Sequence, residues 1–251
     1  MRPDALEELL SPAGGPAIVC AQAGNIDTGA VDPIGEIVHI ARRHGAWCHV
    51  DGAFGLWAAA SPTHRDQTSG IEHADSWVAD AHKWLNVPYD SSFAIVRDPE
   101  AHRAAMALTA AYLPRAEGEE RWPAEWVPEL SRRARAFPVY AALRSLGREG
   151  VARIVDNCCA RAAQLAELLA SVPQADILNK VTLNQVLVRF GDDDAATDAV
   201  IRAVQDDGVC WLSGTTWRGR RAMRVSICHW ATSADDIQRT ARSIVAATQR
   251  R

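Results

Sequence analysis

Two short apolar runs with a helical pattern between them constrain the fold of this chain more than any other feature. Residues 17–21 and 46–50 have the length and apolar character of strands, and residues 32–44 repeat apolar side chains at helical spacing. Asp32 and the proline after it open that pattern, as an acidic N-cap and a first-turn proline do. Because apolar strands are typical of covered parallel sheets, this order predicts a βαβ unit. Ligand sites in such units lie at the carboxyl ends of the strands, where Asp51 falls.

The rest of the chain alternates the same two kinds of pattern. We expect further strands over 76–79, 93–96, 184–190, 209–212 and 222–227, and helices over 4–10, 99–110, 129–146, 149–171, 195–206 and 233–248. The charged stretch 113–128 has no apolar period and is expected to form a mobile loop. The chain is therefore predicted to be an α/β protein in three parts: a sheet-centred part over 1–128, connecting helices over 129–172, and a small C-terminal α/β domain over 173–251.

The composition excludes several classes of function. With 251 residues, 48% of them apolar and 23% charged, the chain resembles an ordinary globular protein. Its net charge of -4 argues against a nucleic-acid-binding surface. No apolar run approaches the roughly 20 residues that cross a bilayer, and the first residues do not resemble a secretory signal. We therefore expect a cytoplasmic protein whose six cysteines are reduced, and the histidines and cysteines lack the spacing of a zinc site.

Lys83 is the residue that most indicates chemistry. It follows a strand-like run, beside His82 and among apolar residues, and a desolvated lysine can attack an aldehyde at neutral pH. A lone lysine is nevertheless more often a solvated surface charge, and the His-Lys pair by itself is a weak indicator. Asp51 ends another apolar strand upstream, where it could equally cap a turn. Together the amine and the carboxylate supply the two charges that pyridoxal phosphate needs, at its aldehyde and at its protonated ring nitrogen.

Small residues beside Asp51 favour the chemical interpretation. Gly52 and Ala53 leave room for a flat ring to approach the backbone, and Ala53 could pack against one face of that ring. A plain structural role stays open for the other candidates, which are His82, Asn25, Thr28 and Tyr112.

These motifs resemble the core of the group II pyridoxal-phosphate-dependent amino-acid decarboxylases, a family that includes aromatic amino-acid and glutamate decarboxylases. The similarity is carried by residues 49–55 (HVDGAFG) and 80–88 (DAHKWLNVP), and it continues through 25–33, 129–138 and 223–226. It implies a fold-type-I transferase-like fold in which residues 1–128 are the C-terminal portion of the cofactor-binding large domain.

The resemblance implies a role for each matching residue near the cofactor. Lys83 would form the Schiff base, Asp51 would pair with the pyridinium nitrogen, and Ala53 would pack on the ring. His82 would lie near the phosphate and the Schiff base.

Further roles are implied at the edges of the site. Asn25 and Thr28 would belong to the loop that approaches the 3-hydroxyl of the cofactor. Tyr112 would protonate the substrate carbon after carbon dioxide leaves. Asp80 stands near the phosphate, where many relatives have asparagine, and an extra anion there weakens phosphate binding unless it is turned away or neutralised.

The start of the chain is the second departure from the family. Residue 1 falls about midway through the large domain of a family member, which predicts exposed apolar sheet edges and poor solubility. The expected function is that of a carboxy-lyase for an amino acid, homodimeric if complete. The alternatives are a truncated, non-catalytic remnant of the fold and another fold-type-I lyase or aldehyde-forming relative.

Overall fold

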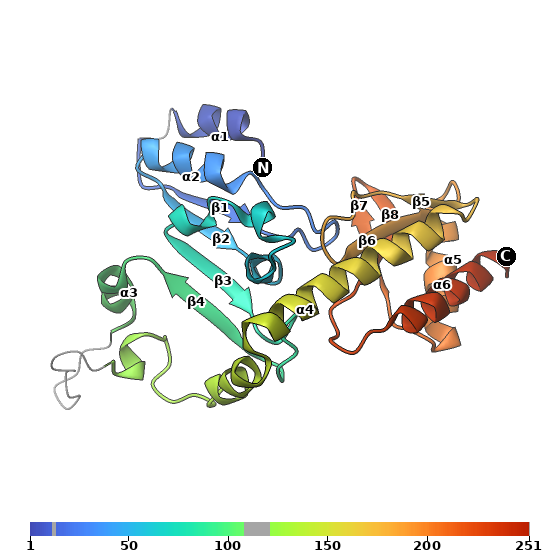
Figure 1. Cartoon of the computed structure of the whole chain (residues 1–251). Helices are drawn as coiled ribbons and strands as arrows, with labels where there is room; N and C mark the ends of the chain where they lie inside the picture. Colours follow the sequence, from blue (N-terminus) through green and yellow to red (C-terminus); the bar gives the residue numbers. More distant parts are fainter. Residues whose placement is uncertain (12–13, 108–120, 251) are drawn as a thin grey trace.

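The computed structural model describes residues 1–11, 14–107 and 121–250, which form two separate β-sheets connected by a long helix (Figure 1). The strand order of the first sheet is β1-β2-β3-β4, with bounds Ile18–Gln22, Trp47–Asp51, Ser76–Asp80 and Ser92–Val96. β1, β2 and β3 are parallel, whereas β4 is antiparallel to β3. The predicted βαβ unit is confirmed, because α2 (Ile34–Arg43) connects β1 to the parallel strand β2.

Helices cover one face of this first sheet. α2 lies against β1 and β2, and α1 (Pro3–Leu10) packs on α2 (Figure 1). Ile37 of α2 is fully buried and shares an apolar cluster with Val19 of β1 and Val50 of β2. Burial of such side chains contributes about 1.5–3 kcal/mol each, so this cluster fixes which face of the strands is turned inward.

The opposite face of β1 has no such cover among the described residues. Because side chains alternate along a strand, Ile18 and Cys20 point away from the helices, in register with Trp47 and His49 of β2. Ile18 is 72% exposed and Cys20 is exposed as well. We call the surface formed by Ile18, Cys20, Trp47 and His49 the open face. The apolar exposure expected from the sequence is therefore found at Ile18 of the edge strand β1.

Short helical turns and one regular helix connect the strands of the first sheet. Three 3-10 turns lie between β2 and β3: η1 (Gly55–Ala60), η2 (Arg65–Thr68) and η3 (Ile71–His73). α3 (Pro99–Met106) follows β4, and the Asp98 carboxylate caps it by accepting from two backbone N–H groups. A further 3-10 turn, η4, spans Pro123–Glu125.

The long helix α4 (Ala136–Ala170) leads to the second sheet, and its backbone leaves helical geometry at Gly147, with φ 60° and ψ -176°. The break predicted at this glycine is confirmed. The helix expected from residue 129 begins only at Ala136, however. Arg135 donates to Asp90 at 2.8 Å and Arg133 donates to the Tyr89 carbonyl at 3.4 Å, so contacts with the loop after β3 hold this segment outside the helix.

The second sheet is antiparallel and belongs to a C-terminal unit, which we define as β5 to α6. Its strand order is β5-β6-β8-β7, with bounds Ala175–Ile177, Gln185–Phe190, Arg220–Ser226 and Ser213–Trp217. α5 (Asp194–Asp207) and α6 (Ala234–Gln249) pack on it together with α4. β6 is buried along its whole length, and Phe190, Leu165 and Ile244 join strand and helices in one core.

Two further local predictions were wrong. The strand expected over 209–212 begins instead at Ser213, because α5 ends in a left-handed Gly208 and the chain then crosses to the polar strand β7. Asp32 does not cap α2. Its carboxylate accepts a hydrogen bond from the Gln22 N–H at 2.8 Å and contacts the amino terminus of Met1, so it ties the helix start to β1 instead.

Candidate active site

The carboxyl ends of β2 and β3 carry the residues that were expected to hold a cofactor. β2 ends at Asp51 and β3 ends at Asp80. The two strands are parallel neighbours, with Asp51 in register with Val78. Lys83 lies in the turn directly after β3, so the acid and the amine are presented at the same end of the sheet.

The turn that carries Lys83 is anchored on its C-terminal side. Trp84 is only 1% exposed and packs against Phe54, with ring centroids 6.1 Å apart. The Asn86 amide donates to the carbonyl of Trp84 at 2.7 Å and to the carbonyl of Cys228 in the C-terminal unit at 2.8 Å. Asn86 has a φ of 60°, a left-handed conformation that asparagine adopts more readily than most residues.

The Lys83 ammonium forms an ion pair at the end of β3. Its Nζ lies 2.8 Å from Oδ2 of Asp80, and the other carboxylate oxygen of Asp80 accepts from the Ser92 hydroxyl of β4 at 2.7 Å. The side chain of Lys83 is 41% exposed, whereas that of Asp80 is 14% exposed. The expected desolvation of Lys83 is therefore wrong, because its flexible stem carries the ammonium out to the carboxylate.

The surroundings of Asp80 keep its carboxylate ionised. Burial raises the pKa of Asp80, but hydrogen bonds from Lys83 and Ser92 and the nearby charges of Lys83 and His82 outweigh burial and leave that pKa below its ordinary value. The extra anion noted at this position is thus neutralised within its own turn.

His82 is held in one orientation by the backbone of Ser91. Its Nδ1 lies 3.0 Å from the Ser91 nitrogen and 2.8 Å from the Ser91 oxygen, so the ring accepts or donates there according to its tautomer. Its Nε2 lies 3.7 Å from Asp80 Oδ2, and the side chain is 9% exposed. The Tyr89 ring packs on the imidazole at a centroid distance of 4.1 Å.

Asp51 and Ala53 are joined to this turn by hydrogen bonds. The Asp51 carboxylate accepts from the Ala53 N–H at 3.1 Å, and the Ala53 carbonyl accepts from the Asp80 N–H at 2.8 Å. Asp51 has the same orientation along β2 as His49 and therefore faces the open side of the sheet. The structure thus brings together five of the expected residues: Asp51, Ala53, Asp80, His82 and Lys83.

Asn25 and Thr28 lie in the loop after β1, next to this cluster. The Asn25 carboxamide oxygen accepts from the backbone N–H and the hydroxyl of Thr28, each at 3.1 Å, so the two side chains stabilise their own loop. The loop adjoins the end of β2, because the Ala23 N–H donates to the Asp51 carbonyl at 2.8 Å. The C-terminal unit also contacts it, through the Asn179 amide that donates to the Thr28 carbonyl at 2.9 Å.

Gly55 permits the loops after β1 and β2 to approach each other. A Cβ atom at this position would lie 2.2 Å from the Ala23 carbonyl oxygen and 2.9 Å from Gly24. No side chain fits in that space, so the glycine is needed for the close approach.

Tyr112 lies outside the described residues, as does the first part of the expected mobile loop, 113–120. The later part, 121–128, contains η4 and is attached to α3, because Arg103 pairs with Glu125 at 2.9 Å. Sequence reasoning missed Asn86 and Ser92. Asn86 could have been noticed, since asparagine adopts left-handed conformations more readily than most residues. Nothing in the sequence marks Ser92 as a partner of Asp80.

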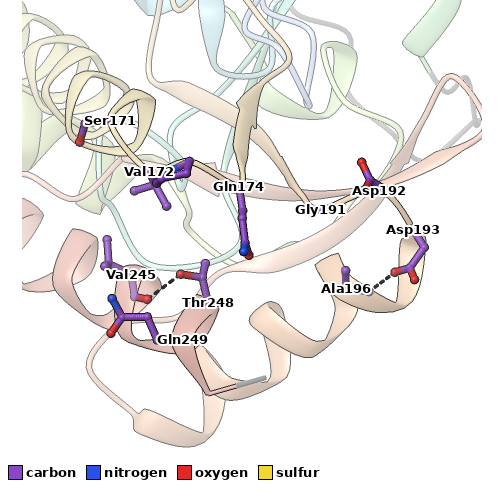
Figure 2. A pocket seen from close by; sticks show the side chains of 11 residues that line it. Ser171, Val172, Gln174, Gly191, Asp192, Asp193, Ala196, Val245, Thr248 and Gln249 are labelled. Carbon is purple, nitrogen blue, oxygen red and sulfur yellow. Dashed lines mark hydrogen bonds between the residues drawn. The ribbon is translucent and has the colours of Figure 1, made fainter.

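A hollow of about 910 Å³ lies elsewhere, on the C-terminal unit (Figure 2). Its lining contains none of the expected site residues and no lysine or arginine that could hold a phosphate; Asp193 there caps α5 through the Ala196 N–H. Within the described ranges, no group of three or more histidine, cysteine or acidic residues could hold a metal ion. No helix in those ranges is both long and apolar enough to cross a membrane.

The chemistry of the donor set fits pyridoxal phosphate. An amine and a carboxylate stand at neighbouring strand ends, and the small Ala53 is hydrogen-bonded to both Asp51 and Asp80. Lys83 and Asp51 are the residues that would hold the cofactor at its two ends.

Comparison with known proteins identifies the family of this chain. The family described as the pyridoxal-dependent decarboxylase conserved domain matches residues 1–190. Phenylacetaldehyde synthase of Arabidopsis thaliana is 28% identical over 90% of this chain and 49% of its own length. Aromatic-L-amino-acid decarboxylase of Drosophila lebanonensis is 26% identical over 97% of this chain and 60% of its own length.

A solved structure shares the fold along the whole chain. The crystal structure of Oryza sativa TDC with PLP and tryptamine superposes with a TM-score of 0.92 at 22% identity, over 100% of this chain and 55% of that one. The chain therefore spans about half the length of the relatives that it matches. The family model covers residues 1–190, which is most of the 251-residue chain, and the chain therefore belongs to the pyridoxal-dependent decarboxylase family.

Proposed function

We propose that this chain carries part of the active site of a pyridoxal-phosphate-dependent amino-acid decarboxylase, with Lys83 as the Schiff-base lysine. The observation that supports the proposal is the hydrogen-bonded cluster from Asp51 through Ala53 and Asp80 to Lys83, at the carboxyl ends of two parallel strands. When bound, the cofactor supplies an electron sink for the bond to the departing carboxylate.

The residues of the chain would bind and orient the cofactor. Asp51 would hold a proton on the ring nitrogen, Ala53 would offer a small surface to the ring, and the amine of Lys83 would hold the aldehyde carbon. His82, fixed by the Ser91 backbone, would present its Nε2 toward the phosphate side.

The remaining roles are proposed on sequence similarity and position. Asn25 and Thr28 form a loop next to the end of β2, which supports their proposed approach to the 3-hydroxyl. We propose that Tyr112 donates a proton to the substrate carbon, because its position in the sequence matches the catalytic tyrosine of the family.

Trapping the cofactor on the protein tests this proposal. Pyridoxal phosphate should give a visible absorbance, and reduction with borohydride should fix its mass on the peptide that contains Lys83. Lys83→Ala should abolish both signals, whereas Lys180→Ala, which removes the other lysine of the chain, should change neither. Absence of binding with every motif residue intact would favour a non-catalytic remnant instead.

An aldehyde-forming activity is the second candidate, and the similarity to a phenylacetaldehyde synthase favours it. Product analysis with an aromatic amino acid separates the two reactions, because a decarboxylase releases an amine and carbon dioxide, whereas the synthase chemistry yields an aldehyde. Tyr112 favours the amine.

The assembly and the division of the chain belong to the same proposal. We propose a cofactor-binding part over 1–128, connecting helices over 129–172 and a small domain over 173–251, which the two separate sheets and α4 between them support. A cytoplasmic homodimer completes the proposal. Light scattering of the purified protein tests the dimer.

A further inference from the structure

The carboxylate of Asp80 forms an ion pair with the amine of Lys83. Its Oδ2 is 2.8 Å from the Lys83 Nζ, and the Ser92 hydroxyl donates to its Oδ1 at 2.7 Å. The hydroxyl therefore fixes the plane of the carboxylate so that the second oxygen points at the ammonium. With 14% of its side chain exposed, Asp80 exchanges this partner for water less easily than a surface acid does.

We infer that Asp80 is a positioning residue that keeps the Lys83 side chain in an ion pair and slows its reaction with aldehydes until that pair opens. This inference rests on the proposed function, since it concerns how readily the Lys83 amine reacts with the aldehyde of a cofactor. An ammonium ion has no lone pair, so it must first release a proton to solvent. The neutral amine then bonds to the carbonyl carbon, and the carbonyl oxygen leaves as water with the two remaining protons of the nitrogen.

Among the described residues, Lys83 is the main charged group that contacts the Asp80 carboxylate. His82 is the other titratable side chain that faces the carboxylate, with its Nε2 at 3.7 Å. The elements packed against the turn contribute neutral groups: Ser92 from β4, the Ala53 carbonyl after β2, and the Trp57 indole of η1, which donates to the Asp80 carbonyl at 2.9 Å. A change in the reactivity of Lys83 on removal of the Asp80 charge is therefore assigned to the pair.

Competitive reductive methylation tests the inference without any cofactor. The whole chain is treated with a trace of formaldehyde and cyanoborohydride, and peptide mass spectrometry gives the methylation of Lys83 relative to Lys180. These are the two lysines of the chain, and Lys180 is exposed, so it serves as an internal standard. Asp80→Asn removes the charge but keeps an oxygen that can accept from Ser92.

The ratio of Lys83 to Lys180 labelling should rise about two- to fivefold in Asp80→Asn at neutral pH, as expected for loss of a half-exposed ion pair. In the wild type the same ratio should rise when sodium chloride is increased to about 1 M, where the Debye length falls to about 3 Å. It should not respond to salt in Asp80→Asn. Circular dichroism verifies that the variant is folded, and the salt series on the wild type needs no variant.

A ratio that is equal in wild type and folded Asp80→Asn, or a wild-type ratio insensitive to salt, would overturn the inference. This outcome is distinct from a failure of the proposed function. Formaldehyde needs no cofactor pocket, so a salt-sensitive Lys83 that never retains pyridoxal phosphate would support the ion-pair role and refute the decarboxylase.

Discussion

At the scale of single residues, Ser92 and Lys83 both donate hydrogen bonds that lower the pKa of Asp80 against the opposing effect of burial. The Ser92 hydroxyl donates to the carboxylate at 2.7 Å, and this bond is one of the causes that lower the pKa of Asp80. A carboxyl group whose pKa is lower in the folded state than in the unfolded state stabilises the fold above its unfolded pKa. That contribution is lost as the pH falls through the folded pKa.

Ser92→Ala should therefore raise the pKa of Asp80 toward its ordinary value. It should also lower the free energy of unfolding at neutral pH by about 1 kcal/mol, because one hydrogen bond to a charged group is removed. Carboxyl-selective NMR titration and urea unfolding measure the two effects. Ser171→Ala is the matched control, since its hydroxyl donates to the Leu168 carbonyl on another part of the chain. An unchanged Asp80 titration would contradict the prediction.

The sequence alone suggested those candidate site residues whose chemical type suits a cofactor. Lys83 and Asp51 were singled out because an amine and a carboxylate after two apolar strands suit pyridoxal phosphate, and Ala53 because a small side chain leaves room for its ring. The Ser92 partner of Asp80 was not predicted, since the contact between these two side chains depends on the antiparallel pairing of β3 with β4. Such side-chain pairs become visible only when the register of the strands is known.

At the scale of elements, the two faces of β1 and β2 should differ in chemical reactivity. Cys20 is exposed on the open face, whereas Cys48 on the covered face is buried, and burial raises its pKa to about 11. At pH 8 only about one in a thousand Cys48 thiols would be ionised. Iodoacetamide should therefore label Cys20 far faster than Cys48, as peptide mass spectrometry would measure. In guanidinium chloride both should react alike; equal protection of Cys20 in the folded protein would mean that the open face is covered.

The close approach of the loops after β1 and β2 predicts that a side chain at Gly55 would destabilise the fold. Gly55→Ala should lower the free energy of unfolding by about 1–3 kcal/mol, because the new Cβ would overlap the Ala23 carbonyl oxygen and push the loops apart. Gly15→Ala adds the same methyl group where no atom lies within 4 Å, so its effect should be below about 0.5 kcal/mol. Thermal unfolding of both variants provides the measurement, and equal melting temperatures would contradict the close approach.

The order of elements was largely predictable, whereas several boundaries were not. Apolar runs and helical spacing located β1, α2, β2 and β3, because burial in the sheet imposes those patterns. β7 (SGTTW) carries little apolar signal and is stabilised by pairing with β8, so it was misplaced. The segment 129–135 was expected to be helical by composition, but Arg133 and Arg135 contact the loop at 89–90 instead.

At the scale of the whole molecule, the open face predicts self-association. Ile18 is 72% exposed on an edge strand, and uncovered strand edges favour pairing between chains. Ile18→Lys should reduce the apparent mass in concentration-dependent light scattering while changing the free energy of unfolding by less than about 0.5 kcal/mol.

The matched control lies on the helical side of the same sheet. Leu9 of α1 is 74% exposed, so Leu9→Lys makes the same chemical change away from the edge strand and should leave association unaltered. A wild-type protein that remains monodisperse and monomeric at high concentration would contradict the prediction.

The two hydrogen bonds of Asn86 join the turn that bears Lys83 to the C-terminal unit. The Asn86 carboxamide donates to the Trp84 carbonyl, next to Lys83, and also to the Cys228 carbonyl after β8. A protein shortened after α4 would therefore lose the hydrogen bond from Asn86 to Cys228, and the turn that bears the Lys83 amine should become less ordered.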